Sequence, residues 1–187
     1  FYQESYSSPS AADYDNDGNL DLFFTTVYGV ASFGRKNNPV LFRNEGQFNF
    51  SNANAATKLE GLGATYQAAW ADFDNDGDLD LMAAGRFFVN SGNKENHWLR
   101  IKLECKKKTV NRFAVGAQVR LKLSNGKILS RQVESGTGQG NQNELTLHFG
   151  LGSYDQPVKV EIFWPDGTIL SLGGVPVDQK FIFNPDN

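Results

Sequence analysis

Residues 12–22 read ADYDNDGNLDL, and residues 71–81 repeat the same pattern as ADFDNDGDLDL. Nine of the eleven positions are identical, and the two copies are 59 residues apart. A weaker echo follows each copy, LFRNEG at residues 41–46 and FFVNSG at residues 87–92, in which an apolar run ends in Asn-x-Gly. Self-similarity at such a period indicates an architecture in which neighbouring repeat units bury each other's faces.

The segments around the two copies predict short strands separated by turns. One unit is expected to hold strands at Val40–Arg43, Phe48–Ser51, Tyr66–Ala71 and Leu79–Ala84. Four short strands in a unit of this length are typical of a β-propeller blade. Only one whole unit is present, flanked by parts of two others, and its sheet edges would stay open. We therefore interpret the chain as the C-terminal part of a longer protein whose remaining propeller blades are partners of this one.

The second half of the chain shows a cleaner alternation of apolar and polar residues. It predicts strands at 99–105, 119–123 and 128–134, with a hairpin turn at Asn125-Gly126. Further strands are expected at 145–149, 158–164 and 181–183, with a turn at 165–167. Six or more short antiparallel strands predict a small β-sandwich or barrel. The fold class is therefore all-β, with partial propeller blades over residues 1–92 followed by this domain over residues 96–187.

Charge and cysteine content exclude several classes of protein. The net charge is −3, but residues 1–92 carry 12 acidic and 5 basic residues, and nine of those acids lie in the two Asp-rich segments. This concentration indicates a local metal site and makes a nucleic-acid partner unexpected. The single cysteine, Cys105, permits no internal disulfide and is expected in the core. No apolar run approaches the roughly 18 residues that would cross a bilayer, so membrane insertion is not expected.

Each Asp-rich segment places carboxylates at relative positions 1, 3, 5 and 9, a glycine at position 6 and a backbone carbonyl available at position 7. Four carboxylates so close together repel one another unless a cation neutralises them. An all-oxygen shell of carboxylates suits Ca²⁺ better than Zn²⁺ or Mg²⁺. The sequence therefore predicts two Ca²⁺ sites. The candidate ligands are Asp13, Asp15, Asp17, Asn19 and Asp21 in the first loop and Asp72, Asp74, Asp76, Asp78 and Asp80 in the second.

The loops have two other interpretations. The loop begins like an EF-hand, but position 12 is Phe24 or Ala83 where an EF-hand has glutamate. The Asp-Asn-Asp-Gly runs could also be simple polar turns, as short Asp-Gly motifs often are. Two near-identical copies with four acids each favour cation binding over the polar turn.

The remaining chemistry-bearing residues give no catalytic pattern. His148 alternates with Leu147 and Phe149 and is expected to face outward, and His97 opens a strand. Neither histidine has an evident nucleophile beside it. The three tryptophans are expected to pack in the core rather than to form a sugar-stacking platform. The chain is therefore predicted not to be an enzyme.

DYDNDGNLDL and DFDNDGDLDL resemble the calcium loops of FG-GAP or VCBS repeats, the units of integrin-like β-propellers. The resemblance implies that the side chains at positions 1, 3, 5 and 9 and the carbonyl at position 7 hold calcium. Every one of these positions is filled in both copies. The motif is specific for the repeat type but does not name a partner.

The second half resembles the ASPIC and UnbV domain. NHWLRIKL at residues 96–103, NRFAVGAQVRL at 111–121, LHFGLG at 147–152 and VEIFWPDG at 160–167 follow its order and spacing. In secreted or surface proteins that domain typically follows VCBS-type repeats, so the resemblance implies a secreted or cell-surface location. It supplies no catalytic residues that could be carried over to this chain.

Two functions from different classes follow. The first is a non-enzymatic extracellular calcium-binding module for adhesion or interaction, whose partner is an unknown protein or polysaccharide at the cell surface or in the matrix. The alternative is a carbohydrate-binding or carbohydrate-active enzyme accessory region. Glycoside hydrolysis needs two carboxylates across a cleft with one pKa raised, and a bound cation has the opposite effect on the aspartates.

Overall fold

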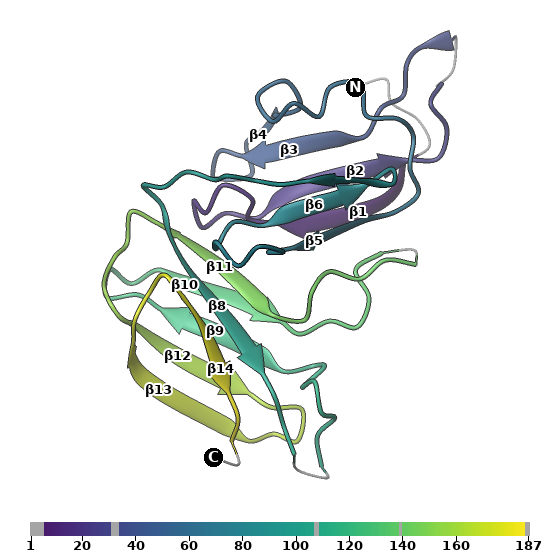
Figure 1. The fold of residues 1–187 in the computed structure, drawn as a ribbon. Coiled ribbons are helices and arrows are strands. Elements are labelled where there is room, and N and C mark those ends of the chain that lie inside the picture. The colour runs from purple at the N-terminus through teal and green to yellow at the C-terminus, as the bar shows by residue number, and fades with distance from the viewer. Residues whose placement is uncertain (1–5, 31–33, 107–108, 139, 186–187) are drawn as a thin grey trace. The chain divides into compact units, whose positions relative to one another are not determined.

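The computed structural model describes residues 6–30, 34–106, 109–138 and 140–185. These residues form fourteen β-strands in four sheets and contain no α-helix (Figure 1). The all-β prediction is confirmed. No helix in this part of the chain is long and apolar enough to cross a membrane.

The strands belong to two compact units that are not continuous in sequence. Of the described residues, the first unit comprises 6–14, 19–30, 34–92, 136–138 and 140–143, and the second comprises 15–18, 93–106, 109–135 and 144–185. The tip of the first Asp-rich loop therefore belongs to the second unit. A short segment between two strands of the second half belongs to the first unit.

The first unit contains two antiparallel sheets. The larger has the order β1 (Tyr6–Ala12), β2 (Asp21–Thr26), β3 (Val40–Asn44) and β4 (Phe50–Asn52). The smaller has the order β5 (Ala68–Ala71), β6 (Asp80–Ala83) and β7 (Arg86–Phe88). Each Asp-rich loop joins the first two strands of its sheet.

The predicted grouping of strands into one unit was wrong. It combined the segments that form β3 and β4 with those that form β5 and β6, but the structure places these pairs in different sheets. The Asp-rich loops are tight connections between adjacent antiparallel strands, so each sheet begins before its loop. Alternation along a strand shows which face is buried but not which neighbour the strand pairs with.

Apolar residues of both sheets form the core of the first unit. Phe23 of β2 is fully buried, and its ring meets that of Trp70 of β5 edge-on, with centroids 6.2 Å apart. The indole nitrogen of Trp70 donates to the hydroxyl of Ser10, 3.1 Å away. The buried tryptophan is therefore both packed and hydrogen-bonded, as a polar-tipped aromatic in a core should be.

The outer edge of β5 pairs with no other strand of the described residues, and the side chains of Asn141 and Asn143 cover it. The backbone N–H of Trp70 donates to Oδ1 of Asn143 at 3.0 Å, and Nδ2 of Asn141 donates to the carbonyl of Ala68 at 2.9 Å. Alternate residues of an edge strand direct their backbone groups away from the sheet. The two asparagines thus take the place that a neighbouring strand would occupy.

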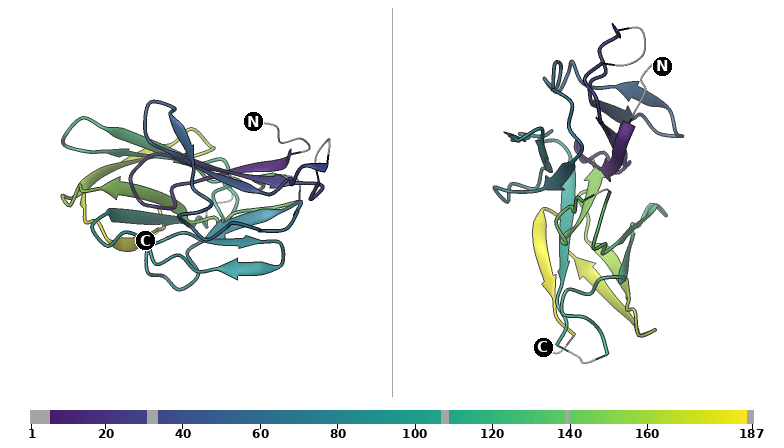
Figure 2. Two further views of the ribbon diagram at one scale, coloured as in Figure 1. Left: turned by 90° about the horizontal axis from the view of Figure 1, so that it is seen from above. Right: turned by 90° about the vertical axis from the view of Figure 1, so that its right-hand side faces the viewer.

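The second unit also contains two sheets. The larger has the order β10 (Ile128–Gln132), β9 (Gln118–Lys122), β12 (Val158–Phe163) and β13 (Ile169–Val175). The smaller has the order β11 (Leu147–Gly152), β8 (His97–Leu103) and β14 (Gln179–Phe183). β14 lies beside β8 and runs parallel to it, the one departure from antiparallel pairing among these strands (Figure 2). The sheets remain separate, so the unit is a sandwich and not a barrel.

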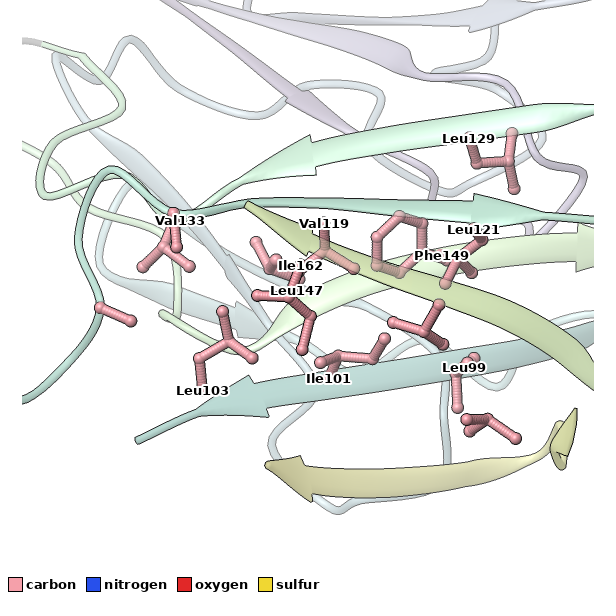
Figure 3. Close-up of a cluster of buried hydrophobic side chains, with 14 of the residues drawn as sticks. Leu99, Ile101, Leu103, Val119, Leu121, Leu129, Val133, Leu147, Phe149 and Ile162 are labelled. Carbon is pink, nitrogen blue, oxygen red and sulfur yellow. The ribbon is translucent and has the colours of Figure 1, made fainter. Parts of the chain in front are cut away.

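The inner faces of these sheets form one hydrophobic cluster (Figure 3). Leu99 and Ile101 of β8 lie opposite Val119 and Leu121 of β9, and all four are fully buried. Cys105 is buried in the same cluster, as predicted. This is the period-2 pattern of half-buried strands, in which every second side chain points into the core.

The two predicted turns are present. Gly126 has a φ of 89°, which is why glycine is suited to the turn that joins β9 and β10. At the other turn the N–H of Gly167 donates to the carbonyl of Trp164, and the carboxylate of Asp166 accepts from the N–H of Thr168 at 3.0 Å.

The prediction that His148 faces outward to solvent was wrong. His148 does lie on the face of β11 away from the core, but only 7% of it is exposed. Its Nε2 lies 2.7 Å from Oδ1 of Asn16, which is itself fully buried. Alternation correctly placed the side chain on the non-core face, but it could not show that a distant loop covers that face.

Candidate metal centre

Each Asp-rich loop brings three carboxylates to one point. Asp13, Asp15 and Asp21 form one group, and each offers an oxygen within 4.8 Å of the others. Asp72, Asp74 and Asp80 form the equivalent group in the second loop. The clustered residues are those at positions 1, 3 and 9, and the two groups match position for position.

The carboxylate at position 9 also fastens the loop. Asp21 accepts the N–H of Tyr14 at 3.1 Å and the N–H of Asn44 at 2.8 Å. Asp80 accepts the N–H of Phe73 and that of Asn90, both at 2.8 Å. These N–H groups belong to the start of the loop and to the end of the third strand of the sheet or the chain just after it. Position 9 therefore holds the loop against its own sheet.

Asn44 and Asn90 support the two loops through hydrogen bonds, although neither was among the predicted ligands. Their side chains also support the loops: Nδ2 of Asn44 donates to the carbonyl of Leu20 at 3.1 Å, and Nδ2 of Asn90 donates to that of Leu79 at 3.2 Å. The signal for both was the Asn-x-Gly echo after each loop. It was recognised as a repeat feature, but nothing in the sequence linked it to the carboxylates.

Positions 4 and 6 of the loops have left-handed backbone. Asn16 and Asn75 have φ of 60° and 61°, and Gly18 and Gly77 have φ of 88° and 93°. Asparagine tolerates this region better than other residues with a side chain, and glycine adopts it freely. The two copies therefore share a backbone turn that folds the carboxylates inward.

The carboxylates at position 5, Asp17 and Asp76, are not members of the two clusters, and the ligand at position 7, a backbone carbonyl, stays a prediction. Oδ1 of Asp76 accepts the N–H of Asp78 at 3.0 Å, while the N–H of Asp17 donates to Oδ1 of Asp15 at 3.4 Å. The carboxylate of Asp78 is buried so closely against Gly92 that a Cβ there would overlap it. Asn19, at position 7 of the first loop, is partly buried.

The clustered residues fit a hard divalent cation. Asp13, Asp21, Asp72 and Asp80 are each at most 4% exposed. Burying several carboxylates in contact with one another is strongly unfavourable unless a positive charge compensates. Three or more carboxylate oxygens, with carbonyl oxygens close by in the chain, make a donor set that suits Ca²⁺.

Within the second unit, Asn16 at the tip of the first loop contacts a buried histidine, His148. Burial lowers the pKa of His148 from 6.5 to about 3, and the charges of Arg131 and Arg100 act in the same direction. His148 is therefore neutral near pH 7. Since the amide oxygen of Asn16 can only accept, Nε2 of His148 carries the proton and donates to it.

Comparison with known proteins supports both resemblances. The family model described as the FG-GAP-like repeat matches residues 13–83, and the model described as ASPIC and UnbV matches residues 107–187. The first match contains both Asp-rich loops. The second begins after β8 and extends to the end of the chain.

Three curated relatives carry the same name, cartilage acidic protein 1. The protein of Mus musculus is 33% identical over an alignment of 180 positions, which covers 89% of this chain and 27% of that protein. The protein of Homo sapiens is 33% identical over an alignment of 168 positions, which covers 86% of this chain and 25% of that protein. The protein of Xenopus tropicalis is 31% identical over an alignment of 189 positions, which covers 90% of this chain and 28% of that protein.

The chain therefore spans about a quarter of the length of these relatives. The similarity covers both the repeat region and the second half, in the same order. The chain has an FG-GAP-like repeat followed by an ASPIC and UnbV domain, and it is homologous to cartilage acidic protein 1.

Proposed function

We propose that this chain is a non-enzymatic extracellular module for adhesion or interaction, in which each Asp-rich loop binds one Ca²⁺. The observation that carries the proposal is the pair of matching carboxylate groups, Asp13, Asp15 and Asp21 in one loop and Asp72, Asp74 and Asp80 in the other. FG-GAP repeats generally bind calcium, and the family match covers both loops.

Calcium would supply the positive charge that the buried carboxylates need. Asp13 and Asp72 at position 1, with the residues at positions 3 and 9, would hold the ion. Position 9 would couple the ion to the sheet, because Asp21 and Asp80 already accept two backbone N–H groups each. The loops would then present a fixed surface to a partner, which is a structural use of the metal and involves no reaction.

The alternative, a carbohydrate-binding or enzyme accessory region, has one specific observation in its favour. Phe73 and Phe87 lie beside the second loop with ring centroids 4.8 Å apart, and they are 70% and 44% exposed. Exposed aromatic rings can stack on sugars. These two rings are inclined by 66° and so form no flat platform. A polysaccharide panel tests this alternative, because binding that is lost in Phe73→Ala and Phe87→Ala would support it.

Calorimetric titration of chelator-treated protein with Ca²⁺ tests the metal proposal. We expect two ions per chain, because each loop offers a matching oxygen set. Heat at only one site, no heat at millimolar Ca²⁺, or a preference for Zn²⁺ over Ca²⁺ would contradict the assignment.

Two variants make the titration specific. Asp74→Ala should abolish one of the two binding events, since Asp74 is an exposed member of the second carboxylate group. Calcium at 100 times its Kd stabilises a folded protein by about 2.7 kcal/mol, so this variant should also lose about that much of the calcium-dependent stability. Asp166→Ala removes a carboxylate that caps a turn, and its cost should be the same with calcium and with chelator.

The proposal extends to location and partners. We infer that the protein is secreted or lies at the cell surface, because FG-GAP repeats and ASPIC and UnbV domains typically occur together in such proteins. The partner at the cell surface or matrix, a protein or a polysaccharide, would meet the calcium-bearing loops or the second unit. Detection of the protein in washed cytosol but not in medium or on the cell surface would contradict this inference.

Further repeats of the same longer protein are the other proposed partner. Ala69, Met82 and Phe87 form one row across β5, β6 and β7 on the face away from the core. Met82 is 55% exposed, and this row carries no charge. An uncharged apolar sheet face is the kind of surface that a neighbouring propeller blade covers.

A further inference from the structure

The two Asp-rich loops have the same backbone conformation but differ in their surroundings. Asn16 and Asn75 occupy position 4 of their loops and have φ of 60° and 61°. Asn16 is 0% exposed, whereas Asn75 is exposed. The same residue in the same conformation is therefore enclosed in one loop and solvated in the other.

Strand β11 encloses Asn16. Residues 15–18 and β11 belong to the same unit, the second. Nε2–H of His148 donates to the side-chain oxygen of Asn16 at 2.7 Å. The N–H of Gly152 donates to the backbone oxygen of Asn16 at 2.8 Å. Both oxygens of this asparagine are thus held by donors from one strand, 132 and 136 residues further along the chain.

The neighbours of Asn16 are held as well. Nδ2 of Asn96, just before β8, donates to the carbonyl of Asp15 at 2.8 Å. A Cβ on Gly18 would lie 2.6 Å from Nζ of Lys127 and 3.2 Å from the carbonyl of Gly150. On either side of Asn16, residue 15 is therefore held by a hydrogen bond and residue 18 is closely packed.

The tip of the second loop faces water, because Phe73, Asp74 and Asn75 are exposed. The N–H groups of Asp76 and Gly77 donate to the two carboxylate oxygens of Asp72, at 3.1 and 3.0 Å. Asp72 belongs to the carboxylate group of this loop. Asp74 of the same group is exposed to water, which competes for the ion.

We propose that the two metal sites are unequal, and that the first loop binds Ca²⁺ more tightly because Asn96, His148 and Gly152 hold its tip in place. The inference rests on the proposed calcium function and concerns its regulation within one chain. A loop ordered in advance loses less conformational freedom when the ion arrives. Partners behind the ligands of a metal site typically change its affinity by about 10- to 100-fold, which sets the expected size of the difference.

Terbium luminescence and calcium calorimetry on the full chain test the inequality. Wild-type protein should bind two ions with dissociation constants at least tenfold apart. Asn16→Ala should weaken the tighter site about tenfold or more and leave the weaker site unchanged. The matched control, Asn75→Ala, places the same substitution at the same φ in the second loop and should leave the tighter site unchanged.

A second variant and a second readout keep the test decisive if Asn16→Ala folds poorly. Asn96→Ala removes only the donor to Asp15 and should also weaken the tighter site. In wild-type protein, hydrogen exchange at the Gly152 amide should slow when the tighter site fills, because that amide donates to Asn16.

The outcomes separate this inference from the proposed function. Two ions bound with equal affinity, or a tighter site that responds to Asn75→Ala and not to Asn16→Ala, would overturn the inference while leaving calcium binding intact. Failure to bind any calcium would overturn the proposed function, and the inference with it.

Discussion

At the scale of single residues, His148 shows how burial turns a titratable side chain into a neutral hydrogen-bond donor. It lies opposite Arg100 in the register of β11 and β8, and Arg131 acts on it from β10. Desolvation is the first cause of its lowered pKa, and the two arginines add to it. Protonation of His148 therefore destabilises the folded state.

We expect the stability of the protein to fall between pH 6.5 and pH 3 partly through His148. The pKa of this histidine is about 3 when folded and about 6.5 when unfolded, so in this window the unfolded state binds more protons. Its contribution is complete above pH 6.5 and is lost as the pH falls. Each pH unit below 6.5 costs up to about 1.4 kcal/mol, which amounts to about 2 kcal/mol by pH 5.

His148→Gln is the control for this prediction, because glutamine can donate to Asn16 but does not titrate. The free energy of urea unfolding should drop less for the variant than for wild type between pH 7 and pH 5, in chelator. Equal drops would show that His148 does not titrate with unfolding, and that carboxylates account for the whole pH dependence.

At the scale of elements, the edge strand β5 depends on side chains from a distant part of the sequence. A three-stranded sheet with an open edge invites pairing with another chain. Asn141 and Asn143 meet the backbone groups of Ala68 and Trp70, and Nε2 of Gln67 donates to the carbonyl of Gly140 at 3.0 Å. Residues 140–143 therefore cover this edge, although they follow β10 in the chain.

Asn143→Ala should uncover the amide of Trp70. We expect the variant to lose about 1 kcal/mol of stability, the usual net contribution of one hydrogen bond with its donor left unpaired. Exchange of the Trp70 amide should quicken, while the amide of Leu81, in the central strand β6, should keep its protection. An unchanged rate at Trp70 would mean that the asparagine does not protect the edge.

At the scale of the whole molecule, the first unit presents an apolar sheet face. The ring of Phe73 contacts Phe87 of this face and is 70% exposed. Its counterpart in the first loop, Tyr14, is half-buried and packs on the core. The side-chain amide of Asn90 reaches the carbonyl of Tyr14 as well as that of Leu79. A further repeat would cover Phe73 in the same way, which is the physical argument for neighbouring blades.

Oxidation of Met82 measures whether such a neighbour exists. Met82 is the single methionine of the chain and is 55% exposed, so peroxide should convert it rapidly to the sulfoxide in the 187-residue chain. In a longer protein that supplies the next repeat, the same residue should react at least several times more slowly. Equal rates in the two proteins would argue against a blade on this face.

Local patterns in the sequence determined a large part of this structure. The repeat at residues 12–22 and 71–81 showed where the carboxylates gather, because ligand spacing and the position-6 glycine act within one loop. Alternation identified the segments of β8, β9 and β12, because a half-buried strand must place every second side chain in the core. Turns at Asn125-Gly126 and 165–167 followed from the backbone preferences of their residues.

Short strands with weak alternation were missed. β1 (Tyr6–Ala12) consists largely of serine and alanine with one proline, and β13 (Ile169–Val175) contains two glycines. Such residues have low strand propensity, and pairing with a neighbour is what makes them strands. β7 is only three residues long, too short for any periodicity to be seen.

Contacts between distant residues were decided by the tertiary structure alone. Nothing near His148 indicates that Asn16 covers it, and nothing near Asn143 indicates that it pairs with Trp70. These contacts bridge separations of 132 and 73 residues, and they depend on where the sheets place each segment. Spacing within the sequence therefore located the carboxylates at positions 1, 3 and 9 that meet in each proposed metal loop, because that spacing acts locally. Only the folded chain decided which of the two loops is held in place, because that support comes from side chains far along the sequence.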